Sequence, residues 1–153
     1  NLGAGNPERA VQGVRVASHY GLGVAAVIGA MFVLIPGYLL AVFGMTDPLV
    51  LSLGRQLLRF LAVSGFFITL ALSYTGGLQG TGDTRSPLYI SIVSQVVVPL
   101  GLCTIFQAVY GLDAFHIWTA IVIGHATRAT LSVLRFRQGK WRGIAVDIEP
   151  ARP

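Results

Sequence analysis

The stretch "FLAVSGFFITLALSYTGGLQGTGDTRSP", residues 60–87, decides the fold of this chain. Its first part, Phe60 to Gly82, contains no Asp, Glu, Lys or Arg, and its last part is a glycine-rich turn that ends in a proline. An α-helix needs about 20 residues to cross about 30 Å of hydrocarbon, so the charge-free part is long enough to span a membrane. The turn is then expected to return the chain to the aqueous surface.

Similar stretches lie on both sides of this one. Val16–Thr46 and Ser86–Leu112 contain no Asp, Glu, Lys or Arg, and Ala114–Leu134 contains only Arg128. Charged residues are 11% of the 153 residues and hydrophobic residues 54%, whereas about a quarter of an ordinary soluble domain is charged. We therefore predict an all-α integral membrane protein with four transmembrane helices.

Prolines mark where these helices begin. Each of the dipeptides Asn6-Pro7, Asp47-Pro48 and Ser86-Pro87 places a capping residue before a proline, which is typical of a helix start. The predicted helices cover about residues 7–43, 48–78, 87–110 and 114–136.

Other residues inside these spans predict local features. Pro36 and Pro99 predict kinks. Gly21, Ala25 and Gly29 recur at every fourth position, which predicts a face for close helix contact.

The basic residues predict the orientation in the membrane. With four crossings, the N-terminus, the turn at residues 80–86 and the C-terminus share one side, which carries Arg9, Arg15, Arg85, Arg135, Arg137, Lys140, Arg142 and Arg152. The other side has Asp47 and Asp113 in its turns, with Arg55 and Arg59 inside the next helix. Because basic loops stay in the cytoplasm, we expect a multi-pass protein of the cytoplasmic (inner) membrane, with both ends of this segment cytoplasmic. The side chains expected in aromatic belts are Tyr110 and Trp118 near one face and Tyr89 and Trp141 near the other.

The glycine-rich turn admits two interpretations. A phosphate-binding loop would need a preceding strand and a closing Lys-Ser/Thr pair, and neither is present. On the first interpretation the glycines end one helix, Asp83 and Ser86 cap the turn, and Arg85 follows the positive-inside rule. On the second, the turn at Asp83 and Arg85 moves during a transport cycle.

Three motifs occur in order along the chain: "LGAGNPERA" (2–10), "GGLQGTGDTRSP" (76–87) and "IVIGHATRATLSVLRFRQGKW" (121–141). In order and spacing they resemble the multidrug and toxic compound extrusion (MATE) transporters, and the chain looks like the last four helices of one. The resemblance implies that residues 1–142 are part of the six-helix C-terminal lobe of a twelve-helix transporter, followed by a cytoplasmic tail at residues 143–153. Related turns occur in both lobes of the family, and the basic "RFRQGKWRG" (135–143) favours the second lobe. We expect the chain to begin inside a longer protein, because it starts without Met and has no signal-peptide layout.

The resemblance implies part of a cation-coupled multidrug efflux antiporter that exports large, often cationic organic compounds by alternating access. The implied partners are the N-terminal lobe of the same transporter, small organic cations as substrates, and membrane lipids. The implied coupling ion is H⁺ or Na⁺, and no cofactor is expected.

Four polar residues inside the predicted helices are candidates for the substrate pathway or for coupling. His125 and Arg128 lie at i and i+3 and so share a face, and ionisable residues inside a membrane are functional candidates. Arg128 could instead extend to the cytoplasmic surface, with His125 hydrogen-bonded to a neighbouring helix. Ser94 and Gln95, close to Pro99, either line a cavity or hold helices together.

The charge-free stretches lack the carboxylate that a cation-coupled antiporter usually needs. Some family members carry an acidic cation ligand in the helix that corresponds to Phe60–Gly82, and this chain does not. Coupling would then depend on the N-terminal lobe, where proton-coupled bacterial relatives keep such a residue, and this favours H⁺ over Na⁺. Within this chain, His125 is the only local group whose type has an unperturbed pKa suited to proton transfer.

Two other classes of protein stay open at this point: a lipid-linked oligosaccharide flippase of related architecture, and a small structural four-helix membrane protein. An enzyme is not expected, because the spans hold no paired carboxylates and no Ser-His-Asp set. His19, His116 and His125 are too scattered for a metal site. The basic segment at residues 135–142 adjoins a span, so it indicates orientation and not nucleic-acid binding.

Overall fold

The computed structural model describes residues 5–144, and within them the chain is helical with no strand. The elements are α1 (Pro7–Leu34), α2 (Pro36–Val42), α3 (Pro48–Gly80), α4 (Arg85–Ile92), the π-turn η1 (Val93–Val97), α5 (Val98–Val109), α6 (Ala114–Arg137) and the 3₁₀ turn η2 (Lys140–Gly143). Four helical segments are long and apolar enough to cross a membrane: Pro7–Leu34, Pro48–Gly80, Arg85–Val109 and Ala114–Arg137. The predicted all-α membrane protein with four transmembrane helices is confirmed.

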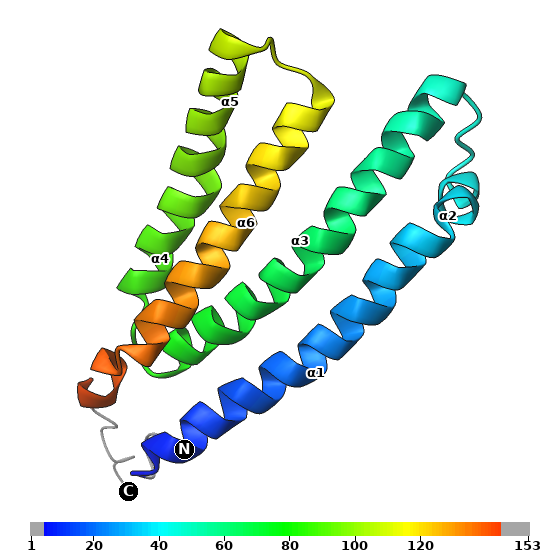
Figure 1. Cartoon of the computed structure of the whole chain (residues 1–153). Coiled ribbons are helices and arrows are strands. Elements are labelled where there is room, and N and C mark those ends of the chain that lie inside the picture. The colour runs from blue at the N-terminus through cyan, green and yellow to red at the C-terminus, as the bar shows by residue number, and fades with distance from the viewer. Residues whose placement is uncertain (1–4, 145–153) are drawn as a thin grey trace, which may run out of the picture.

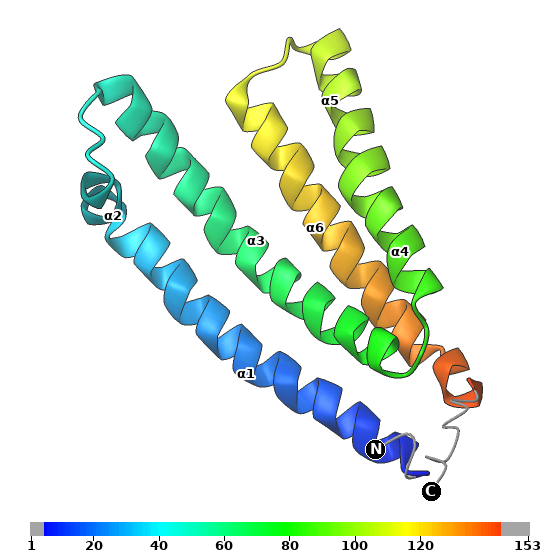
Figure 2. The same ribbon diagram turned by 180° about the vertical axis from the view of Figure 1, so that it is seen from behind.

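The long helices lie side by side in the order α1, α3, α6 and then the continuous α4–η1–α5 segment (Figures 1 and 2). The start of α1, the turn between α3 and α4, and the end of α6 gather at one end of the molecule. The loops that lead into α3 and α6 lie at the other end. Helices of this length, arranged in this way, carry the chain four times through the same thickness.

The first span is not one continuous helix. It was expected to run over residues 7–43 with a kink, but α1 ends at Leu34 and a separate helix, α2, begins at Pro36. Between them, Ile35 has φ −127° and ψ 39°, outside the helical region. A residue that precedes proline is pushed away from helical angles, and proline has no N–H to continue the ladder. Pro36 therefore breaks the helix instead of only bending it.

The caps differ from helix to helix. Asp47 caps α3 as expected, because its Oδ1 accepts from the N–H groups of Leu49 at 2.8 Å and Val50 at 3.0 Å. The Asn6 side chain makes no capping bond to α1. The expected cap at Ser86 is wrong, because α4 already begins at Arg85 and Ser86 lies within its first turn.

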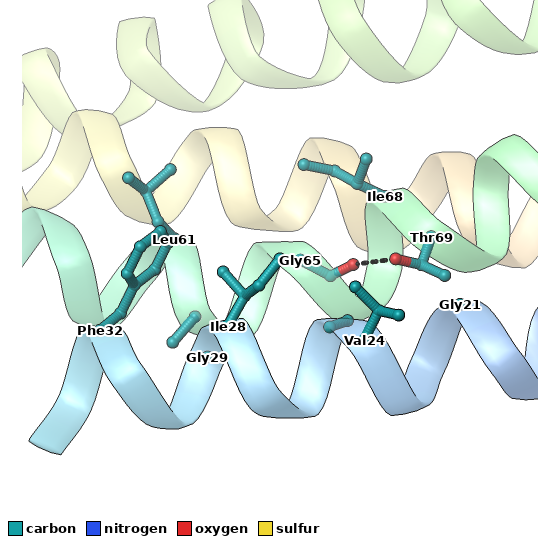
Figure 3. Close-up of a pocket in the computed structure, with 11 residues that line it drawn as sticks. Gly21, Val24, Ile28, Gly29, Phe32, Leu61, Gly65, Ile68 and Thr69 are labelled. Atoms are coloured by element: carbon teal, nitrogen blue, oxygen red, sulfur yellow. Dashed lines mark hydrogen bonds between the residues drawn. The ribbon is translucent and has the colours of Figure 1, made fainter.

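Small residues bring α1 and α3 together, as the spacing of Gly21, Ala25 and Gly29 predicted. A Cβ added at Gly21 would lie 2.6 Å from Thr69 Cγ2, and one at Gly29 would lie 3.6 Å from Ala62 Cβ. Figure 3 shows Gly21 and Gly29 on α1 facing α3. On α3, the Thr69 hydroxyl donates a hydrogen bond to the Gly65 carbonyl at 2.8 Å. The groove along this contact measures about 380 Å³ and has an almost entirely apolar lining.

Large apolar side chains cover the outer faces of the helices. Tyr20, Leu34, Tyr38, Val42 and Phe43 are each 77–82% exposed. A water-soluble monomer rarely exposes so much contiguous apolar surface. These faces suit contact with lipid tails or with further membrane helices.

Candidate functional site

The glycine-rich turn after α3 ends the helix and hydrogen-bonds to its last carbonyl groups. Gly82 has φ +90°, its N–H donates to the Gln79 carbonyl at 3.0 Å, and the Asp83 N–H donates to the Leu78 carbonyl at 3.0 Å. This pair of bonds is the Schellman arrangement, which requires a left-handed residue and so favours glycine at position 82. Thr81 Oγ1 also donates to the Leu78 carbonyl, at 2.7 Å.

Asp83 joins this turn to two helices. Its Oδ1 accepts from the Ser86 N–H at 3.1 Å and so caps the start of α4. Its Oδ2 accepts from Nε of Arg135 at 3.1 Å and from Nη2 at 2.9 Å. Asp83 thereby connects the turn between α3 and α4 to the end of α6, which is far away in the sequence. We call Asp83, Ser86 and Arg135 the turn latch.

The electrostatics of the latch favour the charged carboxylate. Burial alone would raise the pKa of Asp83, which is 6% exposed. Hydrogen bonds from the Ser86 side chain and N–H, together with the Arg135 guanidinium, outweigh burial and hold the pKa of Asp83 below its ordinary value. Asp83 therefore stays ionised and paired at neutral pH.

An aromatic core backs the latch. Leu78, Phe136 and Trp141 are 0–5% exposed and pack together. The Phe136 and Trp141 rings stack with centroids 5.0 Å apart, and Trp141 Nε1 donates to the Phe136 carbonyl at 2.8 Å. The expectation that Trp141 belongs to an aromatic belt is wrong, because its side chain is buried in this core.

A second polar region lies deeper in the spans, where α6 meets the π-turn. A Cβ added at Gly124 would lie 2.6 Å from the Ser94 carbonyl oxygen and 2.9 Å from Pro99 Cγ. Only a glycine allows the two backbones to approach so closely. This contact brings Ser94 and the adjacent Gln95 to the depth of Gly124 and the adjacent His125.

The kink expected at Pro99 takes the form of the π-turn η1. The Val98 N–H donates to the Val93 carbonyl, five residues back. The Ser94 carbonyl comes next in this ladder, but its donor would be the nitrogen of Pro99, which carries no hydrogen. The ladder therefore leaves the Ser94 carbonyl without a helical donor, and this oxygen faces Gly124 instead. Such π-turns are frequent at functional sites.

Buried polar atoms without partners lie beside this contact and further along α6. Within residues 5–144, the atoms Gln95 Nε2, His125 Nδ1, Arg128 Nε and Ser132 Oγ are buried and have no hydrogen-bond partner. On α6, the three residues involved lie at i, i+3 and i+7 and so form one stripe. We call Gln95, His125, Arg128 and Ser132 the orphan cluster.

The structure thus divides the candidate residues between two places. Ser94, with Gln95 next to it in sequence, meets α6 at Gly124, which His125 follows directly and Arg128 follows by one helical turn. Asp83 belongs to the turn latch, and Arg85 is exposed at the start of α4. Among the described residues, no three His, Cys, Asp or Glu side chains lie close enough to hold a metal ion. The sequence-based prediction missed Arg135 as the partner of Asp83, and it missed Ser132. The i, i+3, i+7 spacing from His125 was the signal that could have identified Ser132.

Known proteins with related sequences carry multidrug-resistance names. The probable multidrug resistance protein NorM of Thermotoga maritima is 26% identical over 144 residues, which cover 94% of this chain and 31% of the relative. The probable multidrug resistance protein NorM of Deinococcus radiodurans is 33% identical over 128 residues (78% of this chain, 28% of the relative). The multidrug resistance protein MdtK of Pectobacterium atrosepticum is 32% identical over 139 residues (85% and 30%).

These relatives are much longer than the matched region. The chain spans about a third of the length of the curated relatives that it matches. No solved structure matches it significantly. A sequence model of the MatE family matches residues 1–105, which is more than half of the chain. The chain belongs to the MatE family, as its three motifs, its four membrane-spanning helices and its relatives agree.

Proposed function

We propose that this chain forms one wall of a cation-coupled multidrug exporter of the cytoplasmic membrane, with large organic cations among its substrates. The match to the MatE family carries this proposal, together with relatives named as multidrug resistance proteins. The helices agree with it, because four spans with apolar outer faces need a lipid or protein environment around them. The remaining wall would come from parts of the protein outside this chain.

Alternating access requires that a group of helices move as a unit. The turn latch supports this for one end of the wall, because Asp83 ties the turn between α3 and α4 to Arg135 on α6. The aromatic core around Trp141 extends the same connection. We therefore propose that α3, α4 and α6 move together at their cytoplasmic end and that the latch stays closed during the cycle.

We propose that the coupling ion is H⁺ and that its main binding group lies outside this chain. The stretches Val16–Thr46, Phe60–Gly82 and Ser86–Leu112 contain no Asp or Glu, and neither does α6. A membrane-embedded carboxylate is the usual reversible proton carrier in such proteins. Within this chain, His125 is the candidate for an accessory role, because imidazole is the side chain most often used to transfer protons.

The test uses the full-length protein that contains this chain, expressed in bacterial cells that lack their own dye exporters. Cells with the wild-type protein should retain less of a fluorescent organic cation than cells with the empty vector. A protonophore should abolish the difference. Equal retention in the two strains, at verified expression in the membrane, would contradict the export function.

A further inference from the structure

The orphan cluster has an uncompensated positive charge in the middle of the spans. Arg128 stays protonated in proteins, and no ion pair or hydrogen bond joins its guanidinium to another residue within 5–144. Asp83, in the turn before α4, is already bonded to Arg135 and Ser86. Charged groups inside membranes are nearly always paired, because a lone charge in a low-dielectric medium is unfavourable.

The structure argues against extension of Arg128 to the cytoplasmic surface. A snorkelling arginine carries its guanidinium out to the headgroups and leaves only its aliphatic stem inside. In Arg128, however, Nε is itself buried. The residue also lies nine positions before the end of α6 at Arg137, a distance of about 14 Å along the helix. The Nε end of the guanidinium therefore lies within the span.

The other residues of the orphan cluster supply hydrogen-bond donors and no negative charge. Gln95 Nε2 is a donor, the Ser132 hydroxyl can donate, and His125 Nδ1 can donate in one tautomer. Ser132 is 0% exposed, and its Oγ does not bond the carbonyl four residues back. Ser18, Ser94 and Thr127 all make that bond, at 2.6–2.8 Å. The Ser132 hydroxyl is thus free for another acceptor.

We propose that the orphan cluster is a binding site for a carboxylate. A carboxylate has two oxygens that accept several hydrogen bonds, and it pairs with a guanidinium in fixed geometry. Glu8, in the first turn of α1, is paired with Arg142. The stretches Val16–Thr46, Phe60–Gly82, Ser86–Leu112 and Ala114–Leu134 contain no Asp or Glu, so the carboxylate comes from elsewhere. It is either part of an exported compound or a side chain of the remaining transporter. The first source rests on the proposed export function, whereas the second does not.

The test compares purified full-length transporter carrying Arg128→Gln, Arg128→Lys or Arg137→Gln with the wild type. Arg137 is an exposed arginine at the end of the same helix, so Arg137→Gln is the matched control. The probes are a cationic xanthene dye with a free carboxylate and the ethyl ester of the same dye. Dye binding is measured by fluorescence, and thermal unfolding is measured without dye.

If exported compounds supply the carboxylate, Arg128→Gln weakens binding of the acid dye by about tenfold or more, the loss expected for a charge-assisted hydrogen bond. Binding of the ester stays within about twofold of wild type on the same reasoning. Arg128→Lys restores part of the affinity. Ser132→Ala, which removes a neutral hydroxyl and no charge, weakens binding of the acid dye by a smaller factor, about two- to fivefold.

If the transporter itself supplies the carboxylate, Arg128→Gln affects both dyes equally and lowers the unfolding temperature by several degrees more than Arg137→Gln does. Arg128→Lys then restores most of the stability. If Arg128→Gln does not accumulate in the membrane whereas Arg128→Lys accumulates normally, this result also indicates that the transporter itself supplies the carboxylate.

The carboxylate site is overturned if Arg128→Gln behaves like Arg137→Gln in both measurements. It is also overturned if Arg128→Gln weakens binding of the acid and the ester equally while its unfolding temperature matches that of Arg137→Gln, because no carboxylate would then be involved. Wild-type protein that binds neither dye would count against the proposed export of such compounds. The unfolding measurement would still decide whether the site exists.

Discussion

Gly124 sets how closely α6 approaches the π-turn. A side chain at this position would meet the Ser94 carbonyl oxygen at 2.6 Å and Pro99 Cγ at 2.9 Å, and neither a backbone atom nor a proline ring yields easily. We expect Gly124→Val to separate the two helices and to destabilise the full-length protein by about 1–3 kcal/mol, the usual effect of overpacking. Thermal unfolding in detergent measures this change.

Gly101 on α5 provides the control for that experiment. A Cβ added there meets nothing within 4 Å among the described residues. Gly101→Val should therefore unfold within a degree or two of wild type, in keeping with the small effect of most surface substitutions. Similar losses in the two variants would show that the close contact at Gly124 does not exist.

The turn latch makes a second prediction for single residues. Asp83→Asn removes the charge that holds Arg135, and the one oxygen of the buried amide cannot replace both carboxylate oxygens, of which one accepts from Ser86 and the other from Arg135. Because Arg135 is 28% exposed, solvent compensates part of the loss, and we expect a destabilisation of about 1–3 kcal/mol. Arg137→Ala, which removes an exposed arginine beside the latch, should change the unfolding temperature little.

The pH dependence of this loss follows from the lowered pKa of Asp83. A depressed carboxyl pKa stabilises the folded state above the unfolded pKa of about 3.9, and this stabilisation is lost as the pH falls through the folded value. The difference in unfolding free energy between wild type and Asp83→Asn should thus be constant from about pH 5 to 8 and shrink below about pH 4. A difference that grows on acidification would refute the ion pair.

Single residues were also where the sequence was hardest to interpret. His125, Arg128, Ser94 and Gln95 could be selected because polar groups inside a charge-free span are conspicuous. The link from Asp83 to Arg135 could not be predicted, because it joins residues 52 positions apart and depends on how α3 and α6 pack. Trp141 was misplaced for the same reason, since its burial depends on Phe136 and Leu78 coming together in three dimensions.

At the scale of elements, the contact between α1 and α3 can be tested by cross-linking. A Cβ at Gly29 would lie 3.6 Å from Ala62 Cβ, which is within the range that a disulfide requires. In a protein whose Cys103 is replaced by serine, the pair Gly29→Cys and Ala62→Cys should cross-link rapidly with a mild oxidant. A protease site inserted between Gly44 and Asp47 reports the bond, because cross-linked halves stay together on a gel.

Val27 provides the matched control for this contact. It lies two residues from Gly29 and is 63% exposed, on another face of α1. The pair Val27→Cys and Ala62→Cys should therefore cross-link slowly. Equal rates for the two pairs would mean that the small-residue face of α1 does not pack on α3.

Helix positions were predictable from the sequence, whereas their irregularities were less so. Long apolar stretches identified the spans because hydrocarbon imposes a length on any helix that crosses it. Pro36 and Pro99 were both expected to kink a helix, yet Pro36 separates α1 from α2 and Pro99 follows a π-turn. Which outcome occurs depends on the neighbouring contacts, such as the close approach of the Ser94 carbonyl to Gly124.

For the whole molecule, the orientation in the membrane is an expectation that labelling can check. In full-length protein without Cys103, Leu112→Cys in the loop before α6 should react with an impermeant thiol reagent in intact cells. Leu112 is exposed, and its replacement leaves the cap of α6 at Asp113 in place. Lys140→Cys, beyond the other end of α6, should react only after the cells are opened. The reverse pattern would invert the topology.

Transport by the purified full-length protein in liposomes tests the proposed export function directly. The lumen is loaded with buffer of one pH or sodium concentration, a fluorescent organic cation is added, and a proton or sodium gradient is imposed across the membrane. We expect the cation to move against its own gradient when protons flow in the opposite direction, and a protonophore to stop this movement. No movement of the cation under either gradient, from protein that is folded and inserted, would contradict a cation-coupled exporter.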